Sequence, residues 1–333
     1  MRRFIRFLIL TVSALFFLVP SVSAKATKMP YEAYNYDWWG EPQPQPAPYL
    51  YLETLGSRNK ERISLNNPQD LFEKDGKLYI ADTDNNRILI VTDEGDYVSE
   101  VSEGLSNPKG VFVTADDHIY VADSGNGRIV EFDRDKKFIR EIGRPETELI
   151  PEGINYIPTK LVVDSEGRIY TTAYGINMGL VEINADGSFQ GFMGATKVNV
   201  SPLEYIWKNY FSTKAQKQRM ETIIPTEYSN LYLDGSDFVY ATISNLSNED
   251  HLQKKDALRR LNPTGTDVLR RLGHYTVTGD LYNASDDAAW SEFVDVSATD
   301  YGCYFVLDRA GGKVFCYDGD GNCLFIFGGN GSR

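Results

Sequence analysis

Histidine and cysteine are both scarce in this sequence, with three residues of each type among 333. The histidines, His118, His251 and His274, show no metal-ligand spacing, and no histidine lies close to the cysteines. Zinc sites and histidine-based catalytic groups therefore have no support from local motifs. The motifs of serine hydrolases, zinc proteases, P-loop proteins and dinucleotide-binding enzymes are also missing. These absences leave the enzyme classes that are easiest to detect by motif without support.

Acidic residues outnumber basic ones: the chain has 47 aspartates and glutamates and 34 lysines and arginines, which gives a formal net charge of -13. A negative surface field repels nucleic acid and anionic lipid, so we expect no nucleic-acid partner. Apolar runs of membrane length are missing beyond the first 24 residues, so we expect no membrane span in the mature segment. Aromatic residues reach 13% and glycine is plentiful, a composition that suits many short strands joined by tight turns.

The first 24 residues combine Arg2, Arg3 and Arg6 with an apolar run over 7–19 and small residues that end at Ala24. This order predicts a signal peptide at 1–24 that is cleaved after its last residue. An uncleaved anchor is the alternative, although the apolar run is short for a membrane span. We therefore expect an extracytoplasmic protein, either secreted or associated with the cell envelope.

Residues 25–48 form an extended segment rich in proline and aromatic side chains, including Trp38 and Trp39. Its alternating prolines predict a chain that cannot pair inside a sheet. The segment is either a spacer or a strap across the folded domain. The number of aromatic rings favours the strap, since so many exposed rings are unusual in a free linker.

Two closely similar stretches, 78–91 and 119–132, organise the rest of the chain. Each begins as an apolar strand, ends it at an aspartate, turns through asparagine, and re-enters a second strand at an arginine, which predicts a β-hairpin. The aspartate and the arginine are placed to form a charged, hydrogen-bonded pair. We assign this motif a structural role in the repeat; its residues are Asp82, Asn85, Arg87, Asp123, Asn126 and Arg128.

Further shared signals surround both hairpins, with a proline and a short strand before them and an alternating strand after them. Four short strands in a repeat of about 40 residues are typical of a propeller blade. The pattern resembles the NHL repeat, and this resemblance implies an all-β fold, a six-bladed β-propeller. We expect blades at about 64–104, 105–143, 155–194, 223–273 and 288–328.

A strand expected at 49–56 resembles the fourth strand of each blade and would begin the propeller domain, 49–333, as an N-terminal latch. The three strands that it would complete would lie beyond Arg333. The sequence therefore predicts a six-bladed propeller with five blades and a latch strand visible and the C-terminal blade missing. The alternative is a five-bladed ring with an extra edge strand.

An insertion between the third and fourth blades predicts a helix at about 201–222. A capping box opens it, and Trp207 and Tyr210 belong to its apolar face. The helix either packs on the propeller or docks a partner.

Cys316 and Cys323 flank a predicted turn, so antiparallel pairing would bring them opposite each other. An exported protein permits a disulfide there. Buried free thiols are the alternative interpretation.

The mouth of the central channel is where propellers usually carry function, at the start of the innermost strands. Alignment of the repeats places five residues at equivalent positions there, namely Asp70, Gly110, Lys160, Asn230 and Asp295. Two carboxylates and an amide facing a channel are suitable oxygen ligands for a hard cation such as calcium. A solvated polar rim is the simpler interpretation of the same residues.

The resemblance implies a fold but no single activity, since propellers of this type serve many roles. Our main expectation is a non-catalytic recognition platform that binds a protein or a cell-envelope glycan. Its candidate contact aromatics are Trp38, Trp39, Trp207, Tyr210 and Trp290. The alternative is a calcium-dependent lactonase or lyase of the gluconolactonase-like class, with Asp70, Asn230 and Asp295 around the cation and Lys160 nearby. We find no counterpart of the channel histidines that lyases of this propeller class use.

Overall fold

The computed structural model describes residues 29, 31–51, 63–150, 153–176, 178–194, 228–253, 255–275, 277–281 and 290–330. The chain divides into two compact units, Met1–Pro30 and Tyr31–Arg333, and the fold below is that of the second. The signal peptide predicted for 1–24 and the helix predicted for 201–222, with Trp207 and Tyr210, lie outside the described residues.

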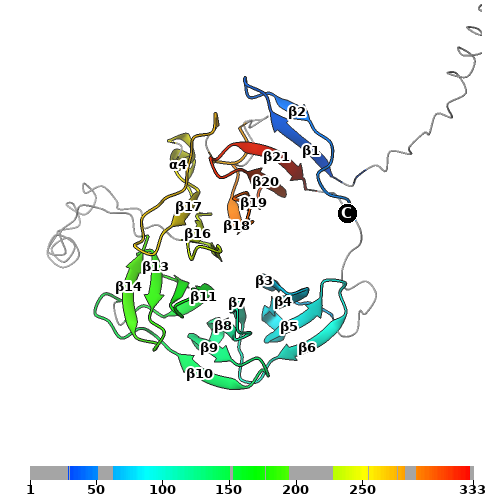
Figure 1. Ribbon diagram of the computed structural model, residues 1–333. Helices are drawn as coiled ribbons and strands as arrows, with labels where there is room; N and C mark the ends of the chain where they lie inside the picture. The colour runs from blue at the N-terminus through cyan, green and yellow to red at the C-terminus, as the bar shows by residue number, and fades with distance from the viewer. Residues whose placement is uncertain are drawn as a thin grey trace, which may run out of the picture. The chain divides into compact units, whose positions relative to one another are not determined.

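Antiparallel sheets follow one another along the described chain, and within each sheet the strands from residue 68 onward lie in sequence order (Figure 1). The first contains β3 (Pro68–Lys74), β4 (Lys77–Asp82), β5 (Arg87–Thr92) and β6 (Tyr97–Val101). The second contains β7 (Pro108–Val113), β8 (Ile119–Asp123), β9 (Arg128–Phe132) and β10 (Phe138–Ile142). The third contains β11 (Ile157–Val163), β12 (Ile169–Tyr174), β13 (Leu180–Ile183) and β14 (Phe189–Met193). The fourth contains β15 (Asn230–Leu233), β16 (Val239–Thr242) and β17 (Leu258–Leu261).

The fifth sheet contains β18 (Phe293–Ala298), β19 (Tyr304–Asp308), β20 (Lys313–Tyr317) and β21 (Cys323–Gly328). It is extended at its outer side by β1 (Glu32–Tyr36) and β2 (Pro42–Pro44), which come from the start of the unit.

The first strands of the five sheets, β3, β7, β11, β15 and β18, contact one another in that order. Figure 1 shows these strands toward a common centre and the later strands of each sheet farther out. Apolar side chains fill the space between neighbouring sheets, as where Ile88 of β5 packs in one cluster with Val111 of β7 and Val121 of β8. Sheets that pack side by side with their first strands innermost are the blades of a β-propeller, the fold that the sequence predicts.

Both predicted hairpins are present, and each has a 3-10 turn between its strands, η1 (Thr83–Asn85) and η2 (Ser124–Asn126). In the second hairpin, Asp123 Oδ2 accepts hydrogen bonds from Asn126 Nδ2 and Arg128 Nε, both at 2.8 Å. Its Oδ1 accepts the backbone N–H of Ser106 at 2.7 Å. The first hairpin repeats this arrangement with Asp82, Asn85, Arg87 and the N–H of Asn66. The aspartate therefore ties the turn, the second strand and the segment before the blade together.

A hydroxyl next to each of these aspartates links one blade to the next. Thr83 Oγ1 donates to the carbonyl of Pro108 at 2.7 Å, and Ser124 Oγ donates to the carbonyl of Pro158 at 2.5 Å. Both hydroxyls are buried, so each bond satisfies a polar group that water does not reach. The repeat thus fixes the spacing between blades as well as the shape of each hairpin.

Most of the latch strand predicted at 49–56 is not tested by the structure, and a different N-terminal strand, which was not predicted, joins the fifth sheet. The strand that pairs with the last sheet is β1, whereas Tyr49 to Tyr51 lie outside any strand and 52–56 lie outside the described residues. β1 pairs with β21, and β2 pairs with β1 at the outer edge of the sheet. Proline suits an edge strand because it has no N–H to offer to a further strand. The proline-rich segment is therefore attached to the fifth blade and is not a free spacer.

Polar contacts of β1 with Asp280 and Lys313 explain why β1 pairs with the fifth sheet. Tyr34 and Tyr36 both donate their hydroxyls to Asp280 Oδ1, the first at 2.5 Å. Lys313 pairs with the other oxygen of Asp280 and donates to the Tyr34 hydroxyl at 2.9 Å. Burial, followed by the carboxylate of Asp280, raises the pKa of both tyrosines. The fifth repeat has lysine where the first two have arginine, and this lysine secures the N-terminal strand.

The fourth blade has no regular outer strand where one was expected, at 268–273. One backbone bond, from Val268 N to Arg260 O at 2.8 Å, holds the chain beside β17. A short helix, α4 (Asn248–Leu252), lies between β16 and β17 and was not predicted, although the capping box of Ser247 and Asp250 was an available signal. No helix in the described part of the chain is long and apolar enough to cross a membrane.

The three cysteines are free thiols. The expected alignment of Cys316 with Cys323 is wrong, because an irregularity in the β20–β21 pairing sets Cys316 opposite Phe325 and Cys323 opposite Tyr317. Burial raises the pKa of both thiols to about 12. These cysteines therefore act as small packing groups, the alternative that the sequence left open.

Candidate functional site

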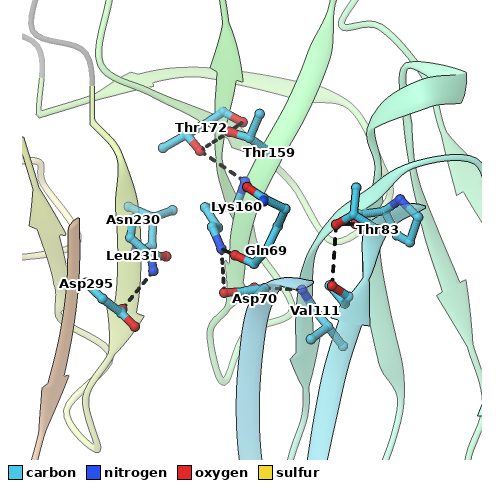
Figure 2. Close-up of polar contacts among 12 residues, drawn as sticks. Gln69, Asp70, Thr83, Val111, Thr159, Lys160, Thr172, Asn230, Leu231 and Asp295 are labelled. Carbon is cyan, nitrogen blue, oxygen red and sulfur yellow. Dashed lines mark hydrogen bonds and ion pairs between the residues drawn. The ribbon is translucent and has the colours of Figure 1, made fainter. Parts of the chain in front are cut away.

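The innermost strands carry a β-bulge close to their start. The pairing register shifts between Pro68 and Asp70 in β3, and equivalent shifts occur in β7, β11 and β18. A bulge re-aims side chains relative to a regular strand. Figure 2 shows the side chains that follow the bulge, those of Asp70, Lys160 and Asp295, together with Asn230 around the centre of the propeller. The structure therefore brings together the channel residues that repeat alignment selected.

Asp70 and Lys160 form the central ion pair. Lys160 Nζ lies 2.6 Å from Asp70 Oδ1, and both side chains are largely buried. The same ammonium donates to the backbone carbonyl of Gln69. The second oxygen of Asp70 accepts the N–H of Val111 in the next blade at 2.9 Å. The pair thus joins the inner strands of the first three blades.

Asn230 and Asp295 form a second polar pair across the fourth and fifth blades. Asn230 Nδ2 donates to Asp295 Oδ1 at 2.7 Å, and that oxygen also accepts the N–H of Val296 at 2.8 Å. The amide oxygen of Asn230 accepts the N–H of Leu231 at 2.8 Å. The amide therefore directs its donor, and not its oxygen, at the carboxylate.

The pKa of Asp295 departs from that of an ordinary carboxyl. Desolvation by the surrounding protein and, second, the negative charge of Asp70 raise it to about 6. The N–H of Val296 and the ammonium of Lys160 act in the opposite direction. The residue still exposes surface to water in the channel, which weakens the energetic consequence of the shift. The shift moves the titration of the Asp295 carboxyl toward neutral pH.

Gly110 holds the corresponding position in the second blade. A Cβ atom there would lie 2.6 Å from the carbonyl oxygen of Thr159 and 3.1 Å from the Cα atom of Lys160. The inner strand of the third blade therefore approaches so closely that no side chain fits. Gly110 therefore allows the two inner strands to approach each other closely and provides no side chain that could bind a ligand.

The oxygen atoms of this set are a poor match for calcium. Asp70 is already neutralised by an ammonium, and the amide oxygen of Asn230 is occupied by a backbone N–H. Calcium takes six to eight oxygen ligands, several of them charged. The described residues contain no group of three or more histidine, cysteine or acidic side chains that could hold a metal ion. The arrangement can bind polar groups by hydrogen bonds, but it offers few free oxygens to a cation.

The turn between β1 and β2 is a second candidate site. Trp38 and Trp39 lie there and are 69% and 82% exposed. Asp37 Oδ1 accepts the backbone N–H groups of Trp39 and Glu41 at 2.9 and 3.0 Å. The positive φ of Gly40, 86°, completes the turn. The two indoles are therefore presented to solvent by a well-bonded turn.

The segment that follows the fourth blade packs against this turn, and no sequence pattern indicated the contact. The ring of His274 stacks on Trp38 with centroids 3.8 Å apart, and Tyr275 donates its hydroxyl to the carbonyls of Asp37 and Trp38 at 3.0 and 2.9 Å. Trp290, the remaining described candidate, is only partly exposed and stacks on His251 at 5.3 Å. The structure thus separates Trp290 from the exposed pair in the turn.

Residues 105–132 match the family model of the NHL repeat, and they span β7 to β9. No curated protein sequence matches the chain. A solved structure of a streptogramin B lyase is 13% identical, with 78% of this chain and 67% of that chain covered at a TM-score of 0.49. Virginiamycin B lyase from Staphylococcus aureus is 12% identical, with coverage of 78% and 69% and a TM-score of 0.49. A protein of unknown function from Bacteroides caccae is 10% identical, with coverage of 78% and 80% and a TM-score of 0.46. Similarities this low carry no conclusion about activity.

Proposed function

We propose that this NHL-repeat β-propeller is an exported, non-catalytic recognition platform that contacts a protein or a glycan of the cell envelope through its β1–β2 turn. The observation that carries the proposal is the adjacent exposed pair, Trp38 and Trp39, on a turn that the body of the fold supports. Export is inferred from the signal-peptide pattern of residues 1–24.

The exposure of the two indoles is costly unless something covers them. Tryptophan is the largest apolar side chain, and tryptophans dominate the binding energy of many interfaces. Aromatic rings also stack on the apolar faces of sugars, so one surface suits both partner classes. The bonds of Asp37 and Tyr275 hold the turn before binding, which reduces the conformational entropy lost on association.

The polar groups of the channel support a non-catalytic role. Asp70 and Lys160 neutralise each other, and Asn230 bonds Asp295, so these side chains already serve the contacts between blades. The histidines have separate partners: His118 contacts Glu131 at 2.7 Å, His251 stacks on Trp290, and His274 stacks on Trp38. No specific observation favours the calcium-dependent lactonase or lyase over the platform.

Binding to envelope material tests the proposal. The purified protein is incubated with insoluble cell envelope of its own organism, and the bound fraction is measured for wild type and for a Trp38→Ala/Trp39→Ala double variant. Loss of two exposed anchors, at about 2 kcal/mol or more each, should weaken the affinity by about three orders of magnitude. A Tyr301→Ala variant, whose ring is 94% exposed on another turn, is the matched control and should bind normally.

Protease treatment of the envelope before binding separates the two partner classes. Retention that is lost after proteolysis identifies a protein partner, and retention that persists identifies a glycan. Wild-type retention by the double variant, with unchanged circular dichroism, would refute the proposed role of the turn.

A further inference from the structure

A cavity of about 320 Å³ lies at the channel mouth and is lined by residues of the first four blades. Three of these residues, Gln69, Lys109 and Thr159, are the bulge residues of β3, β7 and β11. Ser229 precedes β15 at the equivalent place in the fourth blade. The repeat therefore turns side chains of equivalent position toward one space, and Figure 2 shows Gln69 and Thr159 beside Lys160.

The charge of this lining contrasts with that of the chain. Among the described residues, Lys109 and Lys160 line the cavity and no aspartate or glutamate does, although acidic residues outnumber basic ones by 47 to 34 in the whole chain. Lys160 is neutralised by Asp70 at 2.6 Å. Lys109 makes no contact with a carboxylate of the described residues. The described lining of the cavity therefore carries the positive charge of Lys109 without a carboxylate to offset it.

Lys109 also borders a second cavity, of about 590 Å³, which lies over the η2 turn. Arg144 lines that cavity, and the part of its lining that the structure describes contains no acidic side chain. The guanidinium of Arg144 is fixed by bonds to the carbonyls of Ile154 and Ile150 at 2.6 and 2.7 Å. Lys109 therefore lies between two cavities whose described linings contain no carboxylate.

We propose that the channel-mouth cavity binds an acidic monosaccharide, a hexuronate, with its carboxylate at the ammonium of Lys109. The volume suits one sugar ring, since small-ligand pockets begin at about 300 Å³. Hydroxyl and amide side chains that line the cavity provide partners for sugar hydroxyls; they are Gln69, Thr159, Ser229, Ser244 and Asn245. Tyr174, which is 67% exposed, offers an aromatic ring at the rim. This site is separate from the β1–β2 turn and does not rest on its proposed role.

Titration calorimetry with D-glucuronate as the probe and D-glucose as the neutral match tests the site at low salt and neutral pH. A single acidic sugar should bind with a dissociation constant on the order of 1 mM, whereas glucose should bind at least about tenfold more weakly. Lys109→Met should lower the glucuronate affinity at least about tenfold, and Lys109→Arg should keep it within about threefold. Lys137→Met, the same charge change on an exposed turn, is the control and should leave binding unchanged.

The outcomes separate this site from the turn. The Trp38→Ala/Trp39→Ala variant should keep glucuronate binding, so failure of the turn as a recognition site leaves this result intact. Equal binding of glucose and glucuronate would overturn the role of charge. Unchanged affinity in Lys109→Met, or no binding by the wild type up to about 20 mM probe, would overturn the site itself.

Discussion

The replacement of Asp123 by alanine removes the central acceptor of the repeat motif. The side chain of Asp123 is fully buried and accepts three hydrogen bonds, from Ser106 N, Asn126 Nδ2 and Arg128 Nε. In the Asp123→Ala variant the backbone N–H loses its acceptor inside the protein, and the arginine loses its buried counter-ion. The predicted result is strong destabilisation without a change of fold.

The size of the effect follows from what each donor loses. A buried donor left without an acceptor costs about 1–3 kcal/mol, and removal of one partner from a buried ion pair costs about 3–5 kcal/mol. Arg128 is 26% exposed and keeps its contacts with Glu141 and the carbonyl of Gly104, so its charge is not stranded. The lower end therefore applies, and we expect a loss of about 3 kcal/mol in the free energy of unfolding.

Urea denaturation followed by circular dichroism measures this loss. Asp135→Ala, at an exposed acidic residue near the same blade, is the matched control and should change stability by less than about 0.5 kcal/mol. Asp123→Ala combined with Arg128→Met should be less destabilising than the sum of the single variants, because the pair is coupled. A loss below about 1 kcal/mol in Asp123→Ala would refute the assignment of this aspartate as the anchor of the blade.

Three further predictions concern the channel. Gly110→Ala should lower the free energy of unfolding by about 2 kcal/mol, because its Cβ would lie 2.6 Å from the carbonyl oxygen of Thr159. Gly143→Ala is the control and should be tolerated, because a Cβ there has nothing within 4 Å. Equal melting temperatures of the two variants would contradict the close approach at Gly110. The pKa of Asp295 is raised to about 6 in the folded protein, above the value of about 3.9 in an unfolded chain. The folded state therefore binds this proton more tightly, and the contribution of Asp295 to the free energy of unfolding should fall as pH rises between these two values. Asp295→Asn should flatten that dependence, and an NMR midpoint near 4 for this carboxyl would be evidence against the shift. Calcium at about 1 mM should leave the melting temperature unchanged. A calcium site with a dissociation constant of about 10 µM would instead add about 2.7 kcal/mol to the free energy of unfolding at that concentration. Stabilisation by calcium that disappears in Asp70→Asn would restore the calcium alternative.

The repeat could be predicted from sequence because its interactions are local. Asp123, Asn126 and Arg128 lie within six residues of one another, so their spacing alone predicts the hairpin that their hydrogen bonds stabilise. The equivalence of Asp70, Lys160, Asn230 and Asp295 followed from the repeat period, because the same position in each blade occupies the same place on the innermost strand. The sequence by itself thus determined the propeller and the residues that face its channel.

Only the tertiary structure decided which distant groups pair. The sequence predicted a latch strand at 49–56 that would complete a blade beyond Arg333, whereas the structure shows β1 joined to the fifth sheet, where two tyrosine hydroxyls of β1 donate to Asp280 in the segment after the fourth blade. Repeat alignment placed Lys160 at the channel but did not pair it with Asp70, 90 residues away. Nor did composition indicate that Lys109 lies in a cavity whose described lining contains no carboxylate. Strand pairing and ion pairing between residues remote in sequence depend on distances that only the assembled blades determine. Local sequence patterns therefore cannot predict these pairs.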